Sequence, residues 1–407
     1  MNLIQQFFKR LGPGLITASV VLGPGSIIAS SRAGAEAGYG LIWVIVAAGI
    51  LMATYTAMGA RLGCALDTTP LAYLSEHRGR ILSVLVGLSA FFVCAGFQFG
   101  NNLGVSFAVS GVTGTPLWIW PIVFTGLSLA FLFFARHVYV VLERLMMLLV
   151  AVMIVCFVTN LFFTGISVPK LVAGLVPRLG PGQATIAAAM LATNFSIIAA
   201  LYQAYLVRAK GWNRDNLGDA VGDAWTGIAI LGTIVVVIMI GAAQTLFGTG
   251  ADFKSAGDLA NQFGELLGPF ANVVFCLGLG AASFSSFIVN ACAGGAILAD
   301  GLGLDARMEG KPARILAAIC MVIGCVVGIT TLLYSAGTTT SVLLAQASTL
   351  IAAPLAGIIL LVITSSKKTM GDLRNGPVSI GLGIIGLAML GFLFWRTLTS
   401  IAVSLFG

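Results

Sequence analysis

Charge is scarce in this chain, because Asp, Glu, Lys and Arg together make up only 9% of its 407 residues. None of the 14 acidic residues falls in the middle of a long apolar segment, and the 2 histidines, His77 and His137, lie in short charged stretches. The 7 cysteines contain no C-x-x-C pair, and most lie inside apolar segments, where Cys behaves as a small hydrophobic residue. These absences leave no basis for a disulfide framework, a zinc site or an intramembrane acid–base group. We therefore expect neither an enzyme nor a resident cofactor.

Polar surface is equally scarce: 58% of the residues are hydrophobic and the mean hydropathy is +1.04. This composition excludes a soluble globular protein. A membrane-spanning helix needs about 20 mainly apolar residues, and the sequence has eleven such runs with short connections. They lie at about 11–31, 40–60, 81–107, 117–135, 140–164, 185–207, 219–241, 267–298, 313–331, 338–364 and 378–405. The sequence predicts an all-α polytopic membrane protein, a single transmembrane domain over residues 1–407 whose partner is the lipid bilayer.

The basic residues divide unevenly between the two predicted sides of the membrane. If the N-terminus is cytoplasmic, 16 of the 21 Lys and Arg residues lie on the cytoplasmic side, and only Arg32, Lys170, Arg178, Lys254 and Arg396 lie outside. By the positive-inside rule the N-terminus is cytoplasmic and the C-terminus is outside. The net charge of +7 then needs no nucleic-acid partner to explain it. The first run is expected to be a retained helix, and the short loops fit a bacterial plasma membrane.

Two of the runs contain residues that interrupt a helix at the middle. The first has Gly23-Pro24-Gly25-Ser26, and the sixth has Asn194-Phe195-Ser196. The string Ser-Ile-Ile-Ala occurs at both places, at 26–29 and 196–199, five spans apart. An odd number of spans inverts the second copy, as expected for an inverted five-plus-five repeat with broken helices one and six. The repeats would cover about 11–164 and 185–364, with an extra helix at about 378–405. Ordinary helix kinks are the alternative.

The third run places Gly96, Gly100 and Gly104 at intervals of four residues. Small residues at this spacing let two membrane helices approach closely. We therefore expect this face to contact another helix.

Several of these motifs resemble the Nramp (natural resistance-associated macrophage protein) family of divalent-metal transporters, which have the LeuT fold. Residues 12–14, 23–26 and 34–40 resemble the family's first helix, residues 278–286, 293–295 and 301 its eighth, and residues 344–346, 354, 364–368 and 370–371 its tenth. The resemblance covers nearly the full length. It implies a secondary transporter that works by alternating access around the broken helices.

The sequence departs from the family pattern where the family binds its metal. Gly23 stands where the resemblance implies a metal-binding Asp, and Ser26 replaces an Asn. Phe195, Ser196 and Ile197 replace the Met, Pro and His of the sixth helix. Only the carbonyl group of Ala192 and the side chain of Gln346 match liganding positions.

The acidic pair that the resemblance implies in the third helix, on the proton route, appears here as Gln98 and Asn101. An amide does not titrate, so these two side chains cannot carry protons. They either line a pathway or hold helices together, at about 1 kcal/mol each.

These residues define a candidate site without a charged group. The predicted substrate-binding residues are Gly23, Ser26, Ala192, Asn194, Phe195, Ser196 and Gln346, with Gln98 and Asn101 as pathway residues. A metal ion stripped of water needs anionic or soft ligands to offset its desolvation, so tight binding of a bare ion is not expected and the metal-ligand set is left open. In the alternative interpretation Asn194 and Gln346 cap broken helices and Phe195 faces lipid.

Three functions remain open from the sequence. The resemblance favours divalent-cation transport, with an ion that keeps much of its water. The residues alone also fit a small neutral, zwitterionic or anionic organic solute. A membrane sensor that has lost transport is the third, although Gly-Pro-Gly at the midplane costs helix stability and gives a scaffold no advantage. The protein partners are not indicated.

Overall fold

The computed structural model describes residues 12–250, 259, 265–266, 268–334 and 353–406, and every regular element within this part is a helix. Among the described residues, eight helices are long and apolar enough to cross a membrane, or ten if each of two bent helix pairs is one span. The shorter apolar helix α7 (Ile119–Phe134) completes the set. The predicted all-α membrane fold is confirmed, and each of the eleven predicted runs corresponds to one of these spans. Residues 335–352, the first half of the tenth run, lie outside the described part.

Most predicted runs form one continuous helix. These are α4 (Ile42–Ala65), α6 (Arg80–Thr113), α8 (Val138–Thr164), α12 (Leu217–Leu246), α14 (Pro269–Gly301), α15 (Lys311–Tyr334) and α18 (Pro377–Phe406). Large apolar side chains such as Ile81, Phe134 and Phe162 are at least 80% exposed. Such side chains are stable on this surface only against lipid. The chain is therefore an integral membrane protein.

The first run is broken, as predicted. It forms α2 (Pro13–Val21) and α3 (Pro24–Ala37), which meet at an angle of 62°. Pro24 begins α3 because its missing N–H costs nothing in the first turn of a helix. The backbone of Gly23 is extended, with φ −117° and ψ −176°. The last carbonyls of α2 and the first N–H groups of α3 are thereby freed from helical pairing.

The sixth run is broken as well, and without a Gly or a Pro. It forms α10 (Ala184–Asn194) and α11 (Ile197–Ala209), with Phe195 and Ser196 extended between them. The Ser196 hydroxyl accepts a hydrogen bond from the Ala199 N–H at 3.4 Å, so Ser196 is the N-cap of α11. A Cβ atom added to Gly25 would lie 3.8 Å from Thr193 Cγ2. The two breaks therefore lie next to each other.

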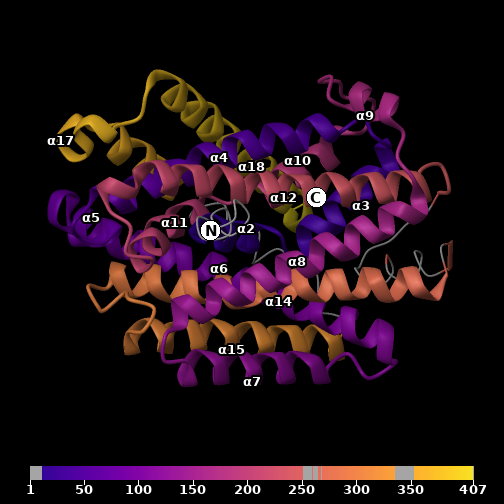
Figure 1. Cartoon of the computed structure of the whole chain (residues 1–407), viewed down its shortest axis with the longest axis horizontal. Coiled ribbons are helices and arrows are strands. Elements are labelled where there is room, and N and C mark those ends of the chain that lie inside the picture. The colour runs from indigo at the N-terminus through magenta and orange to yellow at the C-terminus, as the bar shows by residue number, and fades with distance from the viewer. Residues whose placement is uncertain (1–11, 251–258, 260–264, 267, 335–352, 407) are drawn as a thin grey trace, which may run out of the picture.

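The helices pack in two groups (Figure 1). The first group contains α2, α3, α4, α10, α11 and α12. The second contains α6, α7, α8, α14 and α15, with α6 and α14 in the most extensive contact. Figure 1 shows α14, α15 and α7 at the bottom and α4 and α12 above them. The first break faces the second group, because α2 contacts both α14 and α8.

Short helices lie at the two ends of the bundle. In Figure 1, α5 (Pro70–Arg78) and α17 (Lys367–Met370) lie at the left end, which the basic residues predict to be cytoplasmic, and α9 (Val168–Gly174) lies at the right end. Apolar length did not predict α5 or α9. Their N-terminal residues Pro70 and Pro169 each fall in the first turn, which favours a helix start.

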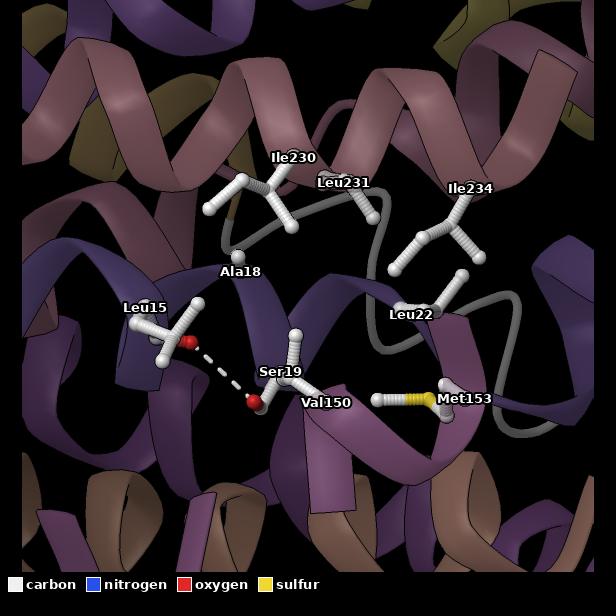
Figure 2. A pocket seen from close by; sticks show the side chains of 9 residues that line it. All are labelled: Leu15, Ala18, Ser19, Leu22, Val150, Met153, Ile230, Leu231 and Ile234. Atoms are coloured by element: carbon white, nitrogen blue, oxygen red, sulfur yellow. Dashed lines mark hydrogen bonds between the residues drawn. The ribbon is translucent and has the colours of Figure 1, made fainter. Parts of the chain in front are cut away.

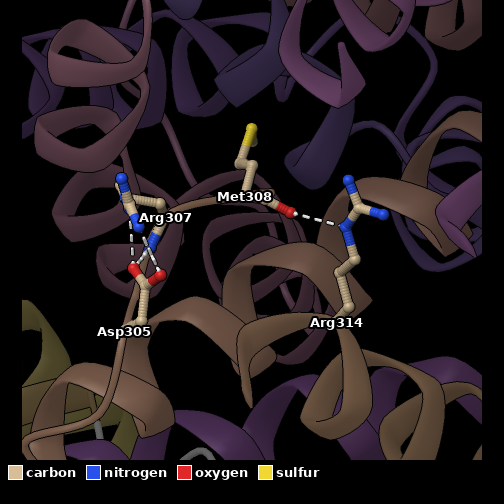
Figure 3. A network of polar contacts seen from close by, with 4 residues as sticks. All are labelled: Asp305, Arg307, Met308 and Arg314. Atoms are coloured by element: carbon tan, nitrogen blue, oxygen red, sulfur yellow. Dashed lines mark hydrogen bonds and ion pairs between the residues drawn. The ribbon is translucent and has the colours of Figure 1, made fainter. Parts of the chain in front are cut away.

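The loop after α14 is held by its own charges (Figure 3). The Arg307 guanidinium donates to both oxygens of Asp305, at 2.8 to 3.2 Å, and these bonds lower the pKa of Asp305. Arg314, at the start of α15, donates instead to backbone carbonyls, including that of Met308 at 3.3 Å. The loop that joins α14 to α15 is therefore stabilised by contacts among its own residues and the start of α15.

The glycine face of α6 is only partly a helix contact. A Cβ atom on Gly104 would collide with Pro24 of α3 and Ser283 of α14, whereas one on Gly100 would meet no atom within 4 Å. The predicted close approach is therefore confirmed at Gly104 and wrong at Gly100.

Candidate functional site

The break at Gly23 is the centre of a buried polar cluster. A Cβ atom on Gly23 would lie 3.1 Å from Ser286 Oγ on α14 and 3.2 Å from Asn101 Oδ1 on α6. A side chain at position 23 would therefore point directly between these two oxygens. The absent side chain leaves the cluster uncharged at the place where α2, α6 and α14 meet.

Gln98 and Asn101 form a directed chain of amide hydrogen bonds. Asn101 Nδ2 donates to Gln98 Oε1 at 3.0 Å, and Gln98 Nε2 donates to the Phe287 carbonyl of α14 at 2.8 Å. Asn102 Nδ2 donates back to the Gln98 carbonyl at 2.8 Å. Both predicted pathway residues are buried, at 0 and 3% exposure. They hold α6 against α14, and Asn101 at the same time turns its oxygen toward the break.

The end of α2 is bound by side chains of α14. Ser286 Oγ donates to the Val20 carbonyl at 3.1 Å, and Asn290 Nδ2 donates to Ser286 Oγ at 2.9 Å. The Val20 carbonyl lies in the last turn of α2, where carbonyls lack a helical donor and carry partial negative charge. Ser286 and Asn290 therefore belong to the cluster. Sequence reasoning missed them, although Ser286 lies in the stretch 278–286 and Asn290 follows one helical turn later on the same face.

The predicted site residues differ in what they contact. The Ser26 hydroxyl donates to the Gly23 carbonyl at 2.9 Å and thus stabilises the break itself. Asn194 Nδ2 donates to the Met190 carbonyl at 2.8 Å, one turn back in α10. Asn194 is therefore not the cap of the helix that follows, and Ser196 has that role. Ala192 is exposed on α10, in the last turn of the helix.

Phe195 is buried and does not face lipid. It is 3% exposed, and its ring contacts Tyr55 of α4 edge to face, with ring centroids 5.5 Å apart. A Cβ atom on Gly386 of α18 would lie 3.1 Å from Phe195 Cζ. The structure thus places the ring between α4 and α18. Gln346 lies outside the described residues.

Some buried oxygens near the break have no hydrogen-bond partner within the described part of the chain. They include Asn194 Oδ1, one residue before Phe195, and Ser283 Oγ, which lies beside the Cβ position of Gly104. Amide, hydroxyl and carbonyl oxygens are ligands for hard cations such as Mg²⁺ and Ca²⁺, whereas thiolate, thioether and imidazole ligands favour softer ions. Among the residues described, no group of three or more His, Cys, Asp or Glu could hold a metal ion. The site therefore offers neutral oxygens and helix ends.

A small cavity lies beside α2, but it is too small and too apolar to be an ion site (Figure 2). Its volume is about 10 Å³, at the lower limit for one water molecule. Leu15, Leu22, Met153 and Ile234 are among the side chains that line it, and the Ser19 hydroxyl is turned back to the Leu15 carbonyl at 3.0 Å. This cavity is apolar packing space between α2, α8 and α12.

The chain matches a known protein family along almost its whole length. Residues 14–400 match the family model described as "Natural resistance-associated macrophage protein-like". The chain is 27% identical to a divalent metal cation transporter MntH of Deinococcus radiodurans, over 97% of this chain and 91% of that protein. It is 25% identical to a protein of the same name from Listeria innocua, over 97% of this chain and 92% of that protein.

Solved structures show the same fold. The manganese transporter of Eremococcus coleocola superposes with a TM-score of 0.86 at 16% identity, covering 99% of this chain and 88% of that one. MhsT in complex with L-phenylalanine superposes with a TM-score of 0.64 at 15% identity, covering 95% of this chain and 98% of that one. The predicted LeuT-type architecture with broken helices one and six is confirmed. Together with the family match over residues 14–400, these findings show that the chain belongs to the Nramp family of membrane transporters.

Proposed function

We propose that this protein is a secondary transporter that carries a divalent cation with part of its hydration shell retained. The observation that carries the proposal is the uncharged oxygen cluster at the Gly23 break. A side chain there would point between Asn101 Oδ1 and Ser286 Oγ, and the chain has none. The relatives named divalent metal cation transporters support a divalent cation as the substrate. The family does not favour an organic solute.

Because position 23 has no carboxylate, we expect a bound ion to keep part of its hydration shell. Removing a divalent ion from water costs far more than neutral dipoles return, so an anionic or soft ligand has to compensate. Magnesium in particular gives up its water reluctantly and usually keeps several water molecules when bound. An ion that keeps its water needs hydrogen-bond acceptors from the protein, and the Asn194 and Ser283 oxygens would supply them. We infer weak binding that discriminates little between Mg²⁺, Ca²⁺ and Mn²⁺.

The proposed site residues keep the roles that their contacts support. Gly23, Ser26 and Asn101 would form the centre, with the helix ends at Ala192 and Asn194 beside it. Ser196 and Phe195 would fix the second break rather than contact the ion. Gln346 stays a proposed ligand. The proposed orientation has the N-terminus in the cytoplasm of a bacterial cell and the C-terminus outside, as the Lys and Arg distribution predicts.

The test is ion uptake into proteoliposomes beside calorimetric titration of the purified protein with Mg²⁺, Ca²⁺ and Mn²⁺. We expect saturable uptake of all three ions with similar affinities, inhibited by hexaamminecobalt(III), whose ligands do not exchange. Uptake of Mn²⁺ alone, insensitive to that ion, would show direct coordination and contradict the retained shell. Uptake no faster than in protein-free liposomes would contradict divalent-cation transport.

A further inference from the structure

Two carboxylates are buried in the helix bundle at the end predicted to be cytoplasmic, and the proposed ion site uses neither. Asp223 on α12 is 3% exposed and Asp300 on α14 is 4% exposed. The α6 amides Gln98 and Asn101 cannot bind a proton. Asp223 and Asp300 are therefore buried groups that can bind a proton, whereas the predicted pathway residues cannot.

Asp300 receives several hydrogen bonds. Its carboxylate accepts from the Thr69 hydroxyl at 2.5 Å, from the Leu71 N–H at 2.8 Å and from the Tyr205 hydroxyl at 2.6 Å. Two of these donors flank the start of α5, where N–H groups lack helical partners and favour a negative charge. The third comes from α11. One carboxylate thus joins three separate parts of the chain.

These bonds cross between the two helix groups. Asp300 ends α14 in the second group, whereas Tyr205 lies on α11 in the first, beyond the second break. Compared with other helix pairs of the bundle, α11 and α14 make few contacts. The bond from Tyr205 to Asp300 is therefore a tie between two bodies that alternating access moves relative to each other.

Asp223 makes a comparable set of bonds within one group. Its two oxygens accept from the N–H groups of Gly12 at 2.8 Å and Gly14 at 2.6 Å, at the start of α2. A Cβ atom on Gly227 would collide with the backbone of Gly14, so α2 and α12 are packed backbone to backbone. Asp223 therefore fixes α2 to its own group and offers a matched control for Asp300.

The cationic side chains on the helices around Asp300 make their hydrogen bonds to other groups, mainly backbone carbonyls. Arg208 on α11 donates to the Asp67 carbonyl at 2.8 Å and also bonds the Leu66 carbonyl. Arg80, at the start of α6, donates to the Leu302 carbonyl at 3.0 Å. On the two remaining neighbours, His77 of α5 stacks on Tyr73. Arg314 of α15 donates to the Met308 carbonyl drawn in Figure 3 and to the carbonyls of Phe133 and Ala135 at the end of α7. Within the described residues, the hydrogen bonds that Asp300 accepts all come from neutral donors.

We propose that Asp300 is a proton-binding site that controls closure of the cytoplasmic end of the transporter. The ionised carboxylate accepts bonds from Thr69, Leu71 and Tyr205 and holds α11 against α14. Proton binding removes the charge, and hydrogen bonds to a charged acceptor are about twice as strong as neutral ones. The new O–H can donate only to a hydroxyl that turns its own hydrogen away, so the bonds that remain are the weaker neutral ones. Acidification of this side therefore loosens the tie. The proposal rests on alternating access in the proposed function but not on the identity of the ion.

The experiment measures the separation of the two groups directly, without any substrate. Spin labels would be attached to two introduced cysteines in a variant whose seven native cysteines are replaced by Ala. The substitutions are Asp215→Cys, between α11 and α12, and Leu304→Cys, after α14. Both positions are exposed. Distance distributions would be recorded in lipid nanodiscs at about pH 8 and about pH 5, because burial makes a carboxylate bind a proton at a higher pH than it does in water. We expect a short distance at high pH and a second, longer component at low pH.

Three variants decide the outcome. Asp300→Asn should show the longer component at both pH values, about tenfold more populated at high pH than in the parent. Tyr205→Phe keeps the ring and removes one donor, so it should raise that component at high pH and keep the response to pH. Asp223→Asn should respond to pH as the parent does, even if its thermal stability is lower. A parent without a pH response, or Asp300→Asn with an undiminished one, would overturn the proposal. Either result would leave ion transport itself untouched, because no ion is present.

Discussion

The ring of Pro24 fills the space that a side chain at position 104 would need. A Cβ atom on Gly104 would lie 3.0 Å from Pro24 Cβ and would collide with the rest of the ring and with Ser283 Oγ. Pro24 begins α3, and Gly104 lies one turn after Asn101 on the same face of α6. This contact therefore positions the first break against the polar cluster.

Gly104→Ala should lower the thermal unfolding temperature of the purified protein. The methyl group has to displace the Pro24 ring and the Ser283 hydroxyl, which costs about 1 to 3 kcal/mol in a packed interior. Gly100→Ala is the matched control, because no atom lies within 4 Å of its Cβ position. Replacing this helical Gly should be neutral or stabilise by up to about 1 kcal/mol. Equal effects of the two substitutions would show that the Pro24 contact is not what makes Gly104 necessary.

Gln98→Glu should make the stability of the protein depend on pH. Gln98 Nε2 donates to the Phe287 carbonyl at 2.8 Å, and an ionised Glu has no hydrogen to donate. At neutral pH the buried charge would face a carbonyl oxygen, at a cost of about 3 kcal/mol or more. A protonated Glu can donate again, so the variant should regain stability as the pH falls.

The measurement is thermal unfolding of Gln98→Glu and of the parent between neutral and mildly acidic pH. Gln98→Met is the control, because it keeps the length of the side chain and cannot titrate. It should be destabilised by a similar amount at all pH values. A Gln98→Glu protein as stable as the parent at neutral pH would mean that water or a cation reaches this position.

The spans and the first break were predictable because their causes are local. About 20 apolar residues suffice to recognise a spanning helix, and Gly-Pro-Gly interrupts a helix whatever surrounds it. The sixth run has no such residue at its break, and only the repeated Ser-Ile-Ile-Ala indicated it. The short helix α5 was missed because its stability comes from contacts such as the bond from the Leu71 N–H to Asp300, far away in the sequence.

The site residues at the first break and on α6 were predictable from the sequence, whereas those on α14 were not. Gly23 and Ser26 lie at the first break, and Gln98 and Asn101 were found through the family resemblance, which implies an acidic pair at these two positions. Ser286 and Asn290 could not be assigned in the same way, because a Ser on an apolar helix usually bonds its own backbone. Their partner is the Val20 carbonyl, more than 260 residues earlier, and only the packing of α14 on α2 brings them together.

Gln346→Ala tests the predicted ligand that lies outside the described residues. If the amide oxygen of Gln346 contacts the ion or its water, the substitution should weaken binding about fivefold to tenfold, as for one lost hydrogen bond. The thermal unfolding temperature should change little. Calorimetric titration with Mg²⁺ and Mn²⁺ would measure the first quantity. Unchanged affinity would remove Gln346 from the site, and a large loss of stability would give it a structural role.

Gly23→Asp should strengthen divalent-ion binding and change its selectivity. The new carboxylate would point between Ser286 Oγ and Asn101 Oδ1, where the Cβ distances of 3.1 and 3.2 Å require those side chains to shift by a few tenths of an ångström. A negative charge at the break compensates part of the ion's desolvation, so we expect at least about tenfold tighter binding, or about 1.4 kcal/mol. Binding should also become less sensitive to hexaamminecobalt(III), because an inner-sphere ligand is now present. Gly23→Asn has the same size without the charge and should show neither effect. If Asp and Asn at position 23 bind Mn²⁺ equally well, charge at the break does not determine how this transporter binds its ion.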